Sequence, residues 1–81
     1  MQVKHYAEGR RYEPVDVIRD WQLSFNLGTA LKYISRAGRK GDVKDMISDL
    51  SKAIDYLEDE KMYQLIKHLE VLNEKEIEDA D

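Results

Sequence analysis

Basic side chains gather in the middle of a chain whose formal net charge is −4. The segment from Lys32 to Lys44 holds one acid, Asp42, and five basic residues: Lys32, Arg36, Arg39, Lys40 and Lys44. Arginine can hold a phosphate through two parallel hydrogen bonds, and lysine supplies a compact positive charge. We therefore predict an anion site here, with a nucleotide phosphate as its ligand.

The same segment begins with residues that suit an anion at a helix start. Asn26 is a good N-cap, and the first turn of a helix leaves backbone N–H groups that favour an anion. Gly28 would let a ligand approach the backbone closely, although a glycine here can equally be a packing residue. Lys32 and Arg36 are four residues apart, so they share one face of that helix.

A second interpretation of the basic segment is a solvated surface balanced by nearby acids. Asp45, Asp49 and Asp55 could supply that balance, and Lys52 between them is typical of an ordinary surface ion pair. Neither the Walker A pattern nor the glycine motif of dinucleotide-binding folds occurs in the sequence. Residue patterns alone leave both interpretations open.

Aromatic and titratable residues could complete such a site. Four tyrosines could stack on a base, or pack at the margin of a core with their hydroxyls in water: Tyr6, Tyr12, Tyr33 and Tyr56. His5 could accept a proton or be an exposed residue of no special role. Glu13 could also act as a base, but the Glu13-Pro14 pair is more typical of a helix start.

Helices must position these residues, and their boundaries can be predicted. The first helix is expected from Pro14 to about Trp21. The second begins at Ser24 or Asn26, and Gly38 ends it as the glycine after the C-cap. Its apolar residues recur at helical spacing, and they are Leu27, Ala30, Leu31 and Ile34.

Asp42 caps the third predicted helix, and Asp45 adds a favourable charge to its first turn. Its apolar stripe runs from Met46 to Leu57, and a second stripe from Met62 to Leu72 is rotated by about a quarter turn. The helix therefore either breaks within residues 58–62 or continues with a second apolar face. No strand pattern is present, so we predict a small all-α fold of three to four helices.

The size of the chain predicts association. A chain of 81 residues builds a small core, and without cysteine it has neither disulfides nor thiolate metal sites for support. Homo-oligomerisation is the expected support. The sequence has neither a secretory h-region nor an apolar run of membrane-spanning length, so we expect a cytoplasmic protein with no membrane contact.

The C-terminal part of the chain is acidic. Residues 53–81 hold ten acids and three lysines. Such a segment could contact another copy, or could bind a host factor as a charge mimic. The acidic total argues against nucleic acid as a partner, including a helix-turn-helix use of the first two helices.

Several of these residues, taken in order and spacing, carry a resemblance to a known family. They are His5-Tyr6, Glu13, Phe25, Gly28, Lys32-Tyr33, Arg36, Lys40, Asp49-Leu50 and Lys52-Ala53. The chain resembles a widespread bacteriophage family of small proteins of unknown function, often labelled nucleotide kinase by similarity to a coliphage nucleotide kinase. The resemblance covers His5 to Glu58, so we expect a core domain over residues 1–58 and an acidic helix or tail over 59–81.

The resemblance implies a phage protein that acts on nucleotides in the cytoplasm of an infected bacterial host. With the rest of the basic segment, the expected binding residues are Tyr6, Asn26, Gly28, Lys32, Tyr33, Arg36, Arg39, Lys40 and Lys52. If the protein is a nucleoside monophosphate kinase, His5 or Glu13 accepts the proton of the acceptor hydroxyl, and four basic residues neutralise the transferred group: Lys32, Arg36, Arg39 and Lys40. The catalytic residues are then expected to be His5, Glu13, Lys32 and Arg36. ATP is then the co-substrate, Mg²⁺ dependence is left open, and no bound cofactor or metal site is expected.

Two other functions remain open at this point. The protein could hold a nucleotide, such as a cyclic or ADP-ribose-type defence signal, without turning it over. It could instead bind a host protein through its acidic C-terminal helix. A single subunit of this size would hardly enclose two nucleotides, so a kinase site would have to form between subunits.

Overall fold

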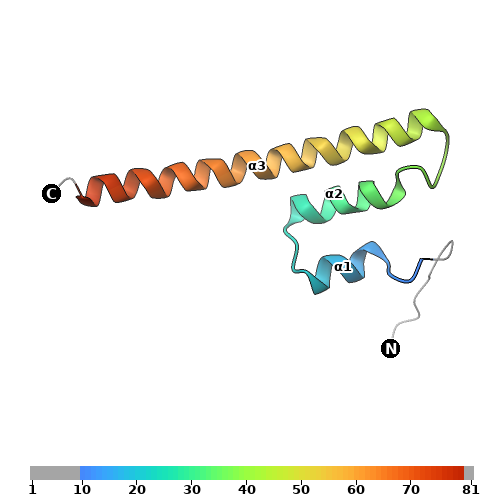
Figure 1. Ribbon diagram of the computed structural model, residues 1–81, viewed down its shortest axis with the longest axis horizontal. Helices are drawn as coiled ribbons and strands as arrows, with labels where there is room; N and C mark the ends of the chain where they lie inside the picture. Colours follow the sequence, from blue (N-terminus) through green and yellow to red (C-terminus); the bar gives the residue numbers. More distant parts are fainter. Residues whose placement is uncertain (1–9, 80–81) are drawn as a thin grey trace.

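The computed structural model describes residues 10–79, which form three helices and no strand. The helices are α1 (Pro14–Asp20), α2 (Phe25–Arg36) and α3 (Val43–Asp79), and they follow one another as an antiparallel meander in a single layer (Figure 1). The predicted all-α fold is confirmed. No helix within this range is long and apolar enough to cross a membrane.

Local signals in the sequence set the ends of α1 and α2. Pro14 opens α1, and the Asp16 carboxylate accepts a hydrogen bond from the backbone N–H of Glu13 at 3.0 Å. Ser24, the first of the two predicted starts, caps α2, and its Oγ accepts from the Leu27 N–H at 3.2 Å. Gly38 follows the C-cap of α2 with φ +82°, a conformation that favours glycine, as predicted.

A reciprocal cap starts α3. The Asp45 N–H donates to Asp42 Oδ1 at 3.1 Å, and the Asp42 N–H donates to Asp45 Oδ2 at 3.0 Å. The helix then runs unbroken through the acidic residues 58–60 to Asp79, a length of about 55 Å at 1.5 Å per residue. Of the two predicted alternatives, a break within residues 58–62 or a continuous helix with a second apolar face, the structure shows the continuous helix.

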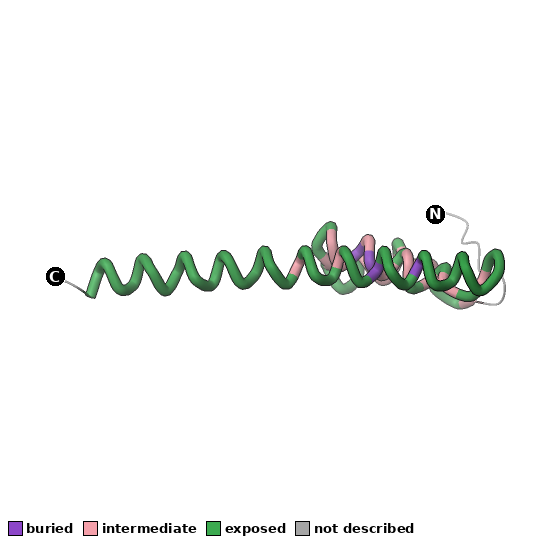
Figure 2. Tube along the Cα trace, turned by 90° about the horizontal axis from the view of Figure 1, so that it is seen from above, coloured by how far each residue is buried: buried purple, intermediate pink, exposed green. Residues whose placement is uncertain are grey.

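Packing is confined to one part of the molecule. α2 lies along the first part of α3, and small residues, Ala30 and Ala53, are buried between them. They are the buried apolar residues of the described range. Figure 2 shows burial where the helices overlap and an exposed second half of α3. The layer measures 61 × 37 × 12 Å, so its thickness is that of about one helix.

Candidate phosphate-binding site

The antiparallel order of the helices brings three chain segments to one end of the layer: the start of α1, the end of α2 and the start of α3 (Figure 1). A depression of about 230 Å³ lies there between α1 and α2. Its lining contains four basic side chains and one acidic one, and consists of Arg10, Glu13, Pro14, Ser35, Arg36, Arg39 and Lys40. Positive charge therefore predominates in this depression.

A second depression of about 220 Å³ lies between α2 and α3. It is lined by Arg36, Lys40, Gly41, Asp45, Ser48, Asp49 and Lys52. Arg36 and Lys40 line both depressions, which are therefore neighbours. The charges in the second depression are more nearly balanced, since two carboxylates accompany its three basic residues.

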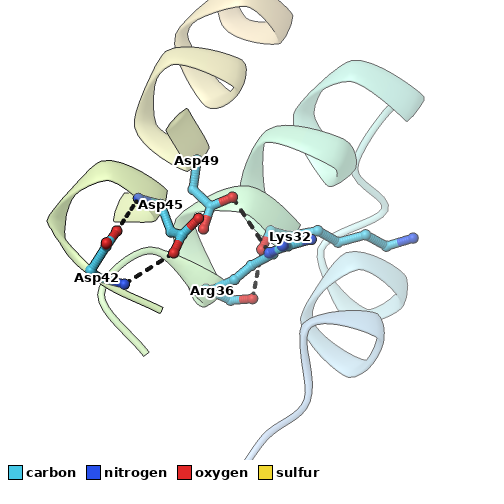
Figure 3. Close-up of polar contacts among 6 residues, drawn as sticks. Lys32, Arg36, Asp42, Asp45 and Asp49 are labelled. Carbon is cyan, nitrogen blue, oxygen red and sulfur yellow. Dashed lines mark hydrogen bonds and ion pairs between the residues drawn. The ribbon is translucent and has the colours of Figure 1, made fainter. Parts of the chain in front are cut away.

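Arg36 is held in place by a buried carboxylate of α3. Its Nε lies 3.4 Å from Asp49 Oδ1, and the Asp49 side chain is 7% exposed whereas that of Arg36 is 59% exposed. Figure 3 shows these two side chains directed toward one another. Because the pair uses Nε, the N–H groups on the two Nη atoms remain for other acceptors.

Two of the four tyrosines expected to stack on a base, Tyr33 and Tyr56, are packed against protein groups, whereas Tyr12 is 61% exposed. The Tyr33 ring stacks on Tyr56 with centroids 6.0 Å apart and an angle of 17° between the planes. Arg36 Cζ and Lys52 Nζ lie 5.9 Å and 5.5 Å from the Tyr33 centroid. Phe25 meets Tyr56 edge to face at 6.2 Å. These contacts favour a packing role for Tyr33 and Tyr56, with Tyr33 supporting the two cations.

Asn26 is separated from the basic residues. It lies at the first turn of α2, ten residues or about 15 Å along the helix from Arg36. Its Nδ2 donates to Asp59 Oδ2 at 2.8 Å and to Glu60 Oε1 at 3.4 Å. Carboxylates of α3 therefore already lie at the positive end of α2, where the sequence suggested a ligand phosphate.

Gly28 and Lys32 also lie apart from the two depressions. A Cβ on the buried Gly28 would come within 3.2 Å of Ile18 Cγ2, so this glycine allows α1 to pack closely on α2. This geometry favours the packing role over close approach of a ligand. The Lys32 side chain is exposed and points away from the Arg36–Asp49 pair (Figure 3). Neither residue is in the lining of either depression.

The structure thus groups Arg36, Arg39, Lys40 and Lys52 with Glu13 at one end of the layer. His5 and Tyr6 lie outside the described residues. Sequence reasoning missed Arg10 and Ser35, which also line the first depression. Arg10 would have been found by assuming an antiparallel meander, because that arrangement brings the start of α1 beside the end of α2.

Comparison with known proteins identifies one family. A family model described as "Protein of unknown function (DUF3310)" matches residues 1–58. Neither the curated proteins nor the solved structures contain a match. The family match ends inside α3, close to Asp59 and Glu60, where the side chains of α2's first turn contact α3.

Proposed function

The chain belongs to the DUF3310 family of proteins of unknown function, and we propose that it binds a nucleotide through its phosphate at the basic end of the helical layer. The observation that carries the proposal is the lining of the first depression. Four basic side chains, Arg10, Arg36, Arg39 and Lys40, surround it with a single acid, Glu13. Such a set attracts an anion and offers arginine donors to phosphate oxygens.

The sizes of the two depressions support a nucleotide site in which the phosphate occupies the first depression and the rest of the nucleotide extends toward the second. Pockets that enclose a whole small molecule have volumes of about 300–1,000 Å³, and the first depression has about 230 Å³. A phosphate group suits this volume better than a complete nucleotide does. Sugar and base would extend toward the second depression, since Arg36 and Lys40 border both.

The proposed reaction is phosphoryl transfer from ATP to a nucleoside monophosphate, in a protein of phage origin. Its support is the resemblance to phage proteins labelled nucleotide kinase. An oxygen of the monophosphate would form a bond to the γ-phosphorus of ATP as the bond from that phosphorus to the bridging oxygen breaks and ADP leaves. Arg36 and Lys40 would neutralise charge on the transferred group, and Glu13, in the same depression, would accept the proton of a monophosphate that binds as the monoanion. The exposure of Arg36 favours a second candidate, binding without turnover, because phosphoryl transfer requires a site closed to water.

Thermal denaturation with a panel of dGMP, dTMP, ATP and inorganic phosphate tests the binding proposal. A ligand at 100 times its dissociation constant adds about 2.7 kcal/mol to the free energy of unfolding. Lys40→Ala should remove most of this stabilisation because Lys40 borders both depressions. Lys44→Ala is the matched control, since it removes the same charge from a residue that lines neither depression.

The absence of any nucleotide-dependent shift in the unmodified protein would contradict the proposal, as would equal losses in the two variants. Chromatography of a mixture of protein, ATP, Mg²⁺ and a monophosphate then separates the two candidates. Formation of nucleoside diphosphate identifies a kinase, and stabilisation without product identifies a binding protein.

A further inference from the structure

The second half of α3 exposes an apolar stripe, and two of its residues, Met62 and Ile66, also line a depression beside the start of α2. Met62, Leu65, Ile66, Leu69 and Leu72 are each between 46% and 54% exposed. They lie beyond Asp59 and Glu60, the last α3 residues that α2 contacts through side-chain hydrogen bonds. An exposed apolar stripe of this length is typical of a protein interface.

The stripe continues onto the first half of α3, on a side that α2 leaves open. Ile47 and Ile54 are 57% and 53% exposed, whereas Asp49 and Ala53 are buried beside α2. From Ile47 through Ile54, Leu65 and Leu69 to Leu72, successive separations are 7, 11, 4 and 3 residues. Each separation is close to a whole number of helical turns, so these residues share one face of α3, on which Glu58 and Lys61 separate Ile54 from Leu65.

The accessible surface of the molecule exceeds that of a compact monomer of the same mass. The accessible surface is 6944 Å², whereas a compact monomer of 9.5 kDa has about 5,000 Å². The radius of gyration is 18.1 Å, against about 12 Å for a compact domain of this length. Even half of the excess surface, about 1,000 Å², meets the roughly 800 Å² that each partner buries in a standard stable interface.

We propose that a second copy of this chain docks on α3 in antiparallel orientation, so that each copy covers the other's apolar face. Full overlap of the two helices places Lys61, the middle residue of α3, beside Lys61 of the other copy. Leu72 then lies opposite the other copy's Leu50, and Leu65 opposite its Leu57. The first apolar stripe of each helix thereby meets the second stripe of the other.

Charge selects the antiparallel orientation. Residues 70–79 contain five acids and one lysine, a net charge of −4, whereas residues 43–52, which lie opposite them in this register, contain two lysines and two acids and are neutral. Antiparallel docking sets the acidic end of each copy beside a neutral segment of the other. Parallel docking would set two acidic ends together, which costs free energy.

Association can be tested by sedimentation equilibrium of the full chain and of two variants. The unmodified protein should have twice the chain mass. Leu69→Lys, on the shared apolar face, should raise the dimer dissociation constant by at least about tenfold. Val71→Lys is the control, because it adds the same charge at a residue that is equally exposed, 58% against 54%, but lies outside the shared face. A monomeric unmodified protein, or equal effects of the two variants, would overturn the proposal.

Orientation can be tested by cross-linking, because the sequence contains no cysteine of its own. Leu50→Cys and Leu72→Cys chains of different tag length are unfolded together, refolded and oxidised. Antiparallel docking predicts that the disulfide-linked product is the mixed dimer, and that each variant alone remains uncross-linked. Self-linked Leu72→Cys dimers would indicate parallel docking and overturn the proposal, and so would the absence of the mixed product. This test does not depend on nucleotide binding, so its failure leaves the proposed function unaffected.

Discussion

Arg36 combines a structural and a proposed binding role in one side chain. It lies 3.4 Å from the nearly buried carboxylate of Asp49, and it borders both depressions at the basic end of the molecule. The basic segment can be interpreted either as an anion site or as a surface whose charge nearby acids balance, and each interpretation describes part of the structure. Asp49 balances Arg36 as the solvated-surface interpretation expected, while Asp45 caps α3.

The ion pair predicts an asymmetry between its two partners. Arg36→Ala should lower the free energy of unfolding by about 1–3 kcal/mol, because it leaves the buried Asp49 carboxylate without a partner. Asp49→Asn should cost less, since the exposed guanidinium can bind water instead. The double variant should recover much of the loss of Arg36→Ala. Urea denaturation of the four proteins measures this cycle, and strictly additive losses would contradict it.

The positions at which the helices of this chain begin and end depend on a few local interactions. α3 is the clearest case, because Asp42 and Asp45 exchange backbone hydrogen bonds at its first turn. This arrangement is a capping box with aspartate in the place of the usual glutamate. The same turn positions Gly41 and Asp45 at the second depression, so the cap also shapes the candidate site.

Loss of this cap should destabilise the protein measurably. Asp42→Ala should lower the free energy of unfolding by about 1 kcal/mol, within the usual range for N-cap substitutions. Asp55→Ala removes the same charge from an exposed position inside α3 and should change stability by less than about 0.5 kcal/mol. Thermal denaturation of both variants is the measurement. Equal effects would show that the charge, and not the cap, matters.

The whole molecule is a thin layer with two buried apolar residues, Ala30 and Ala53, within residues 10–79. Such a layer cannot draw much stability from its own core. Residues 61–79 of α3 are exposed throughout, whereas a helix in a protein draws most of its stability from the packing of its apolar face. The proposed second copy would supply that packing.

Helix content should consequently depend on protein concentration. Far-ultraviolet circular dichroism should show loss of helix as the protein is diluted below the dimer dissociation constant. Leu69→Lys should lose helix at a higher protein concentration than the unmodified chain does, and Val71→Lys should behave like the unmodified chain. A helix content that is independent of concentration in all three proteins would mean that α3 is stable alone, contrary to this expectation.

Local interactions make the positions of the helices predictable from the amino-acid sequence by itself. Glu13-Pro14, Ser24, Gly38 and Asp42 act through hydrogen bonds and backbone preferences within three or four residues, so neighbouring residues contain the information. Three of the basic residues that line the depressions, Arg36, Arg39 and Lys40, are likewise visible as a cluster along the chain. Even the continuation of α3 is one of the two outcomes that its apolar stripes predict.

The grouping of residues from different helices required the tertiary structure. Asn26 and Arg36 were expected in one site because they are close in sequence, but a straight helix holds them about 15 Å apart. Asp59 and Glu60 reach the start of α2, and Arg10 reaches its end, because the helices are antiparallel. Charged side chains interact when they lie close together in space. Which of them do so depends on how the helices pack, and the spacing of residues along the chain does not determine that packing.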